Sequence, residues 1–198
     1  MQEMEEPTID ERRRWWSFCY SITAMNKAKA ACDRIAEHCE DWDHPLFEPL
    51  ALAVHTFYSR PFLNSYGAGR LEATIVPEVQ KGIHEWLTHF RSSFMAHTDA
   101  TEDRWAGRVI NEVVYYCAGE KMGFTTLYGR SPLSQYVDAG IHCSKMVEVF
   151  QAKLTEFYRD YGHLMPLEQG EYLLSLEPDS PTFRLGHITP DRDTFIYK

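Results

Sequence analysis

The chain lacks a long apolar run and lacks an apolar segment at its N-terminus. No stretch of its 198 residues approaches the roughly 20 consecutive apolar residues that a membrane-spanning helix needs. The sequence opens with Met1-Gln2-Glu3-Met4-Glu5-Glu6, which is too polar for a secretory signal. We therefore expect a cytoplasmic protein that makes no contact with a membrane.

Basic residues are also scarce. The sequence holds 20 Lys and Arg against 29 Asp and Glu, for a formal net charge of −9. This balance argues against broad electrostatic adhesion to nucleic acid, which needs an excess of cations. A small local basic site remains compatible with it, because the run Arg12-Arg13-Arg14 shows that the positive charge is unevenly spread.

Cysteine pairs with metal-binding or redox spacing are missing as well. The five cysteines are an odd number and none of them forms a CxxC motif. Cys32 and Cys39 lie seven residues apart on one expected helix face, which favours reduced core residues. Aromatic residues, in contrast, are plentiful, and 198 residues suffice for one globular domain with a real core.

Apolar residues recur at three- and four-residue steps over several long segments, which is typical of helices. We predict helices over residues 12–40, 45–59, 77–97 and 131–161. Asp10 is a plausible N-cap for the first, and Gly162 fits the end of the last. Their expected inward faces include Leu46 of the second helix, Val79 of the third, and Val137 and Ile141 of the last.

Between the third and last helices the pattern changes to β-branched and aromatic residues. Residues 109–117 and 122–128 are predicted to form a β-hairpin. The expected fold is mainly α: an up-and-down four-helix bundle with a small β-hairpin insertion before the last long helix. We assign residues 1–162 to this domain. Residues 163–198 form a C-terminal extension with a strand-like segment at 172–176, which packs on the bundle or on a neighbour.

The stretch from Arg91 to His97 combines a permanent cation with a side chain that titrates near neutral pH. Six residues advance about 600° on an ideal helix, so these two side chains would point roughly 120° apart. A two-fold partner would solve this geometry by placing one pair opposite the other across a shared cleft. Spacing alone favours a structural interpretation, with a hydrogen-bonded core histidine at 97 and an arginine that pairs with a surface carboxylate.

The motif Arg91-Ser92-x-x-x-x-His97, late in a helix of an expected bundle, resembles the signature of the HEPN superfamily. The ending His97-Thr98-Asp99 is similar to one bacterial and phage-associated branch. The block Phe57-Tyr58-Ser59-Arg60-Pro61-Phe62, with Asn64 close behind, resembles the exit of that branch's second helix. The resemblance covers roughly residues 15–160. Ser92 departs from it, because the family most often has Asn at that position.

The resemblance implies a metal-independent endoribonuclease that acts as a homodimer, with no cofactor and with a toxin or phage-defence role. His97 would exchange protons with the ribose 2′-OH or the leaving 5′-oxygen, and Arg91 would hold the scissile phosphate. The alternative is a catalytically inactive HEPN-like module that binds RNA, a nucleotide or a protein. A purely structural dimerisation bundle is the third possibility. An antitoxin or regulatory protein is a further expected partner.

Four other residues complete the predicted site. Ser92 would donate to a phosphate oxygen or to the helix backbone, and Asp99 would orient His97 or cap the next turn. Arg60 would be a second phosphate contact or part of a structural ion pair, and Asn64 would support RNA binding. No metal site is expected.

Several other groups invite a functional interpretation but favour a structural one. The histidines at 84 and 89 are five residues apart, which is not the spacing of two metal ligands on one helix face. The residues His38, Asp41, Asp43 and His44 are expected to be solvated loop residues, and 67–70 a turn. Arg12-Arg13-Arg14 with Trp15-Trp16 would either bind RNA or form a solvated helix start over a buried Trp.

Overall fold

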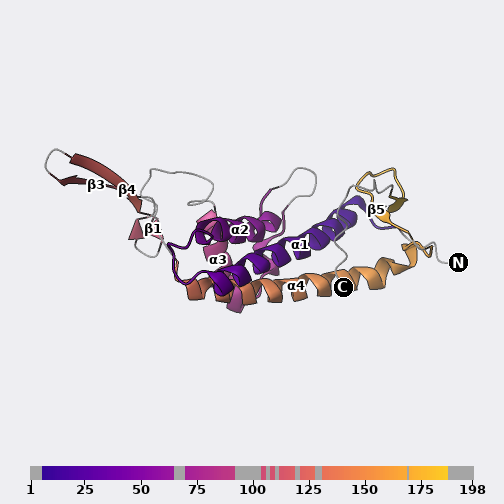
Figure 1. Cartoon of the computed structure of the whole chain (residues 1–198). Coiled ribbons are helices and arrows are strands. Elements are labelled where there is room, and N and C mark those ends of the chain that lie inside the picture. Colours follow the sequence, from indigo (N-terminus) through magenta and orange to yellow (C-terminus); the bar gives the residue numbers. More distant parts are fainter. Residues whose placement is uncertain are drawn as a thin grey trace.

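The computed structural model describes residues 6–64, 70–91, 104–105, 108–109, 112–118, 121–127, 131–168 and 170–186. These residues form a mainly helical protein with a small antiparallel hairpin ahead of the last long helix (Figure 1). The α-helices are α1 (Ile9–His38), α2 (Phe47–Ser59), α3 (Lys81–Phe90) and α4 (Leu133–Tyr161). The strands are β1 (Arg104–Trp105), β2 (Arg108–Val109), β3 (Glu112–Ala118), β4 (Lys121–Leu127), β5 (Tyr172–Leu174) and β6 (Phe183–Leu185).

The two long helices α1 and α4 lie side by side along almost their whole length, and α2 and α3 cover only part of them (Figure 1). This follows from length, because α1 has 30 residues and α4 has 29, whereas α2 has 13 and α3 has 10. Two separate groups of buried residues result. We call the one shared by all four helices the larger core, and the one built on Trp15, Leu154 and Phe157 the smaller core.

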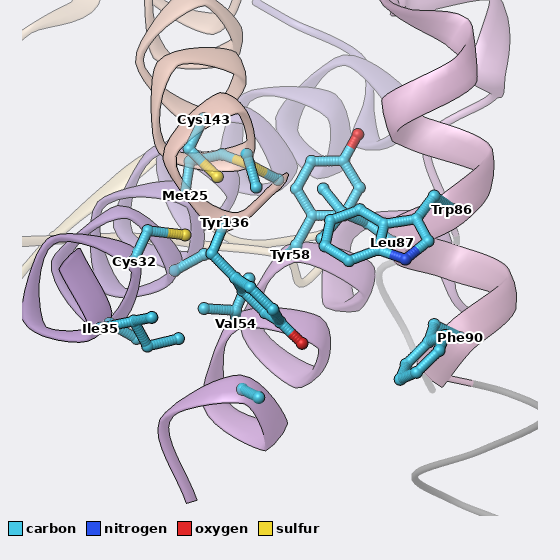
Figure 2. Packing of buried hydrophobic residues seen from close by; sticks show 14 of the residues in the cluster. Met25, Cys32, Ile35, Val54, Tyr58, Trp86, Leu87, Phe90, Tyr136 and Cys143 are labelled. Carbon is cyan, nitrogen blue, oxygen red and sulfur yellow. The ribbon is translucent and has the colours of Figure 1, made fainter. Parts of the chain in front are cut away.

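The larger core is closely packed with large side chains (Figure 2). Trp86 and Leu87 of α3 meet Tyr58 of α2, and Cys143 of α4 lies toward α1. Gly140 explains how closely the long helices approach, because a Cβ there would lie 3.2 Å from the Cβ of Cys32. The predicted reduced core cysteines are confirmed, since both Cys32 and Cys39 are buried and free.

Beyond α2 and α3, the C-terminal segment covers the smaller core. β5 and β6 pair antiparallel, with Tyr172 opposite Leu185 and Leu174 opposite Phe183. The ring of Phe183 packs edge-on against Trp15 at 5.2 Å between centroids. Of the two arrangements expected for this segment, the described part therefore packs on the helices of its own chain.

The predicted hairpin is confirmed. β3 pairs with β4 from Glu112 opposite Leu127 to Ala118 opposite Lys121. Figure 1 shows this hairpin projecting away from the helices. Among the described residues, no helix has the length and apolar character required to cross a membrane.

The boundaries of α1, α2 and α4 are close to those predicted, whereas α3 begins at Lys81 after a 3-10 helix at Glu78–Gln80 and its predicted end near residue 97 lies outside the described residues. The N-cap of α1 is not Asp10. Thr8 takes that place: its hydroxyl accepts the Glu11 amide at 3.3 Å, and the Glu11 carboxylate accepts the Thr8 amide at 2.7 Å. This is a capping box, and its Thr-x-x-Glu pattern is visible in the sequence. Gly162 caps α4 as predicted.

Several residues predicted to face the core are exposed instead. Leu46 is 49% exposed, and Val79 is 91% exposed because the short 3-10 helix before α3 turns the neighbouring Gln80 inward. Val137 and Ile141 are 47% and 52% exposed. Where α4 approaches α1 closely, its inward face includes small residues and the hydrogen-bonded His142. That inward face holds Tyr136, Ala139, Gly140, His142, Cys143 and Met146.

Candidate functional site

Arg91 lies at the described end of α3, where its side chain is half-buried. Its backbone amide donates to the carbonyl of Thr88, three residues earlier. The carbonyl of Leu87 accepts two side-chain bonds from α2, from His55 Nδ1 at 3.1 Å and from the Ser59 hydroxyl at 3.4 Å. These bonds tie the last turn of α3 to α2 and set the position from which Arg91 projects.

His55 serves this attachment as a neutral side chain. It is fully buried, and desolvation lowers its pKa to about 4. A carbonyl oxygen can only accept, so the neutral ring carries its proton on Nδ1. The opposite nitrogen, Nε2, has no hydrogen-bond partner among the described residues, and the ring packs against Trp86 and Phe90. His55 is therefore a neutral, buried side chain that links α2 to α3.

Arg60 and Asn64 are both exposed, just beyond the end of α2. The Arg60 guanidinium lies 4.8 Å from the centre of the Phe57 ring, a cation–π contact. Within the described part of the chain it forms no ion pair, so the aromatic ring takes the place of the carboxylate considered above.

The residues around Arg60 contact two levels of α3. The rings of Tyr58 and Phe62 contact His84, whereas the Ser59 hydroxyl donates to the Leu87 carbonyl. The described contacts do not join the two arginines. Ser92, His97 and Asp99 lie outside the described residues.

A buried chain of four polar side chains runs through the larger core, and sequence reasoning missed it. The Tyr58 hydroxyl lies 2.8 Å from His84 Nδ1 and 2.7 Å from His142 Nε2. His142 Nδ1 lies in turn 2.9 Å from the Gln80 side-chain oxygen. The links join α2, α3, α4 and the 3-10 helix before α3. No sequence spacing signals the chain, because its members are up to 84 residues apart.

The hydrogen bonds that join these four side chains all run in one direction. The Gln80 oxygen accepts from His142 Nδ1–H, which leaves His142 Nε2 to accept from the Tyr58 hydroxyl. The same hydroxyl oxygen then accepts from His84 Nδ1–H. Burial, followed by the charge of His84, lowers the pKa of His142 to about 4, and burial also lowers that of His84. Burial raises the pKa of Tyr58. All three groups are therefore neutral near pH 7.

The run Arg12-Arg13-Arg14 does not form one basic surface. Arg12 is only 4% exposed and donates to the carbonyls of Pro7 and Ser180 and to the Glu6 carboxylate. Arg13 pairs with Asp10 at 3.1 Å, whereas Arg14 is exposed. Of the two interpretations, the structural one holds in part: Trp15 is buried, but Arg12 is a buried anchor and not a solvated residue.

The remaining groups that the sequence analysis considered have contacts of other kinds. His44 Nδ1 accepts the Leu46 amide at 3.2 Å and lies 3.6 Å from the Cys39 sulfur. Arg70 is exposed and pairs with Glu72; residues 67–69 lie outside the described part. Across the residues that the structure describes, no three His, Cys, Asp or Glu side chains are grouped so that they could hold a metal ion.

Comparison with known proteins assigns this chain to no family. No family model, no curated protein and no solved structure matches the chain. The evidence on function therefore lies in the residues themselves.

Proposed function

We propose that this protein is a HEPN-like, metal-independent endoribonuclease that acts as a homodimer. The observation that carries the proposal is the attachment of the end of α3 to α2 through His55 and Ser59. It gives Arg91, the first residue of the motif, a defined base from which to hold a phosphate. The mainly helical architecture is compatible with the bundle that the resemblance implies.

In the proposed reaction His97 removes the proton of a ribose 2′-OH, and the 2′-oxygen attacks the adjacent phosphorus. The bond from phosphorus to the 5′-oxygen breaks, and the leaving oxygen takes up a proton from an imidazolium. Arg91 binds the phosphate and stabilises its developing charge by paired N–H bonds. The products are a 2′,3′-cyclic phosphate and a 5′-hydroxyl, and no metal takes part.

The other predicted residues take supporting roles in this proposal. Ser92 donates to a phosphate oxygen, and Asp99 orients His97. Arg60 and Asn64, which are exposed just beyond the end of α2, contact RNA outside the reacting phosphate. Two copies of the chain supply two Arg91–His97 pairs to one cleft. A toxin or phage-defence role, with an antitoxin or regulatory protein as partner, belongs to the same proposal.

An RNase assay on the purified protein tests the proposal. We expect Arg91→Ala and His97→Ala each to reduce cleavage at least about 100-fold, the scale of a general acid–base contribution, with cleavage by the unchanged protein insensitive to EDTA. Arg34→Ala and His38→Ala, two exposed positions on α1, are the matched controls and should retain full activity. Cleavage that survives both site substitutions would show that the reaction occurs elsewhere.

A non-catalytic RNA- or nucleotide-binding module is the second candidate. Ser92 favours it, because the proposed family most often has Asn at this position. In this case the protein would bind RNA without turnover, and Arg91→Ala would weaken binding. If the protein neither binds nor cuts RNA and Arg91→Ala only separates the dimer, Arg91 is a structural residue of an interface.

A further inference from the structure

A pocket of about 570 Å³ opens beside the smaller core, between α1, α4 and residues 70–75. Its volume lies within the range of pockets that hold small molecules. It forms where α2 and α3 no longer cover the two long helices (Figure 1). The third wall is held in place, because the Leu71 amide donates to the Pro61 carbonyl at 2.8 Å and Val76 is buried.

The lining of this pocket joins apolar surface to charged groups. Phe18 and Phe157 of the long helices and Leu71 and Ile75 of the third wall supply the apolar part. At one end the Tyr161 hydroxyl donates to the Glu11 carboxylate at 2.7 Å, which links α4 to α1. Two aromatic rings on facing helices suit a flat or aliphatic molecule.

One of the three cations on the pocket wall forms no close ion pair with a lining carboxylate. Each carboxylate already has a partner: Glu11 accepts from Tyr161, Glu156 from Lys153 at 2.9 Å, Glu72 from Arg70 at 3.4 Å, and Asp160 from Arg159 at 2.9 Å. Two of the three lining cations are thereby occupied.

Arg14 is the remaining cation of the wall. It is exposed and forms no hydrogen bond or close ion pair with a described residue, although its charge helps to lower the pKa of the neighbouring Glu11 carboxyl. A guanidinium presents five N–H donors in a planar fork, which matches a carboxylate, sulfonate or phosphate. The four carboxylates around it disfavour a second negative charge on the ligand.

We infer that this pocket binds a small molecule with a flat apolar body and a single anionic group, the body lying against Phe18 and Phe157 and the anion on Arg14. Aromatic carboxylates and aromatic sulfonates both have this chemistry, whereas a nucleoside monophosphate carries close to two negative charges near pH 7.

The pocket is separate from the proposed nuclease site. Tyr136 of α4 contacts His55, which holds the end of α3 near Arg91. The pocket uses α4 from Lys153 onward, about 25 Å farther along the helix axis. The inference therefore stands or fails independently of RNA cleavage.

Two fluorescent probes test the inference. 8-Anilinonaphthalene-1-sulfonate has a flat apolar body with one sulfonate, and N-phenyl-1-naphthylamine has nearly the same body without the charge. We expect the protein to bind the sulfonate saturably and more tightly than the neutral probe. Arg14→Gln should weaken sulfonate binding about tenfold and leave the neutral probe unchanged, since only a charge-assisted bond is lost.

Two further variants locate the effect. Arg34→Gln, on the same helix outside the pocket, should leave binding of both probes unchanged. Thr74→Trp, at an exposed position of the third wall, should block both probes by filling the space. Equal affinity for the two probes, or the same result for Arg14→Gln and Arg34→Gln, would overturn the inference.

Competition identifies the source of the natural ligand. Displacement of the sulfonate by 1-naphthoate would assign an aromatic carboxylate, whereas displacement by adenosine 5′-monophosphate, which is nearly dianionic, would contradict the preference for a single charge. If neither competes at millimolar concentration, the dye binds adventitiously and the inference is wrong.

Discussion

The larger and smaller cores lie on the same two helices, yet they are stabilised differently. In the larger core Met25, Tyr58 and Phe150 have no exposed surface, and the Tyr58 chain of hydrogen bonds crosses between elements. In the smaller core Leu154 and Phe157 remain 8% and 9% exposed.

The cover of the smaller core is also thinner. Two short strands lie over it, and Leu173 and Leu185 of those strands are more than half exposed. The buried Arg12 guanidinium holds this segment from α1 through the Ser180 carbonyl. The difference shows what coverage by α2 and α3 provides. Side chains are fully buried where these two helices lie, whereas beyond them a groove opens and the covering strands are held by a polar contact.

The largest expected effect is destabilisation by acid, which should act through buried histidines of the larger core. His55 and His142 belong to the larger core, and the pKa of each is about 4 when folded against an ordinary value of 6.5. As the pH falls, the histidines of the unfolded chain therefore become protonated before those of the folded protein. The free energy of unfolding is unaffected by this difference above about pH 6.5 and decreases as the pH falls toward 4. Between pH 7 and 4.5 we expect a loss on the order of 5 kcal/mol for the two together.

Urea unfolding as a function of pH checks this prediction. His55→Phe should remove about half of the pH dependence, because one of the two titrating groups is gone. His38→Asn, which changes an exposed histidine of α1, should leave it unaltered. A pH dependence equal in all three proteins would mean that the buried histidines do not titrate on unfolding.

Removing one hydroxyl tests the hydrogen-bonded chain of the larger core. Tyr58→Phe deprives both His84 and His142 of a buried partner, so we expect a loss of about 3 kcal/mol in the free energy of unfolding. Tyr136→Phe is the matched control: this tyrosine is equally buried in the larger core but contributes ring packing. Its substitution should cost less than about 1 kcal/mol. Equal losses would assign the effect to packing.

The smallest effect should be local and confined to the smaller core. Arg12→Gln removes the anchor to Ser180 and should cost about 2 kcal/mol in the opening of residues 172–186. Hydrogen exchange should quicken at the Ser175 and Gly186 amides, which are bonded to the carbonyls of Thr182 and Glu171. Amides of α4 should keep their protection. Arg13→Gln, with its exposed ion pair, is the control, and equal exchange in both variants would show that Arg12 is no anchor.

Much of the fold could be predicted from local patterns. Three- and four-residue apolar spacing placed α1, α2 and α4 within a few residues of their observed ends, and the change to β-branched residues located the β3–β4 hairpin. Prediction of faces was weaker. Val137 and Ile141 fit an apolar stripe as well as their buried neighbours do, and only the approach of α4 to α1 at Gly140 decides which side is inside.

The candidate site could likewise be predicted from the sequence only in part. Sequence motif alone singled out Arg91 and His97, and the structure adds how the end of α3 is held before Arg91. The Tyr58 chain had no sequence signal, because hydrogen bonds between residues far apart depend on how helices pack.

By itself, the sequence determined most of the helical and extended segments and the absence of CxxC motifs. It also contains the capping box of Thr8 and Glu11, although our prediction placed the cap at Asp10. These properties depend on residues within a turn or two of each other. Only the tertiary structure decided that Arg12 is buried, that Tyr58 joins two histidines, and that a pocket opens where α2 and α3 stop. Each of these depends on side chains that packing brings together from distant parts of the chain, which local periodicity does not encode.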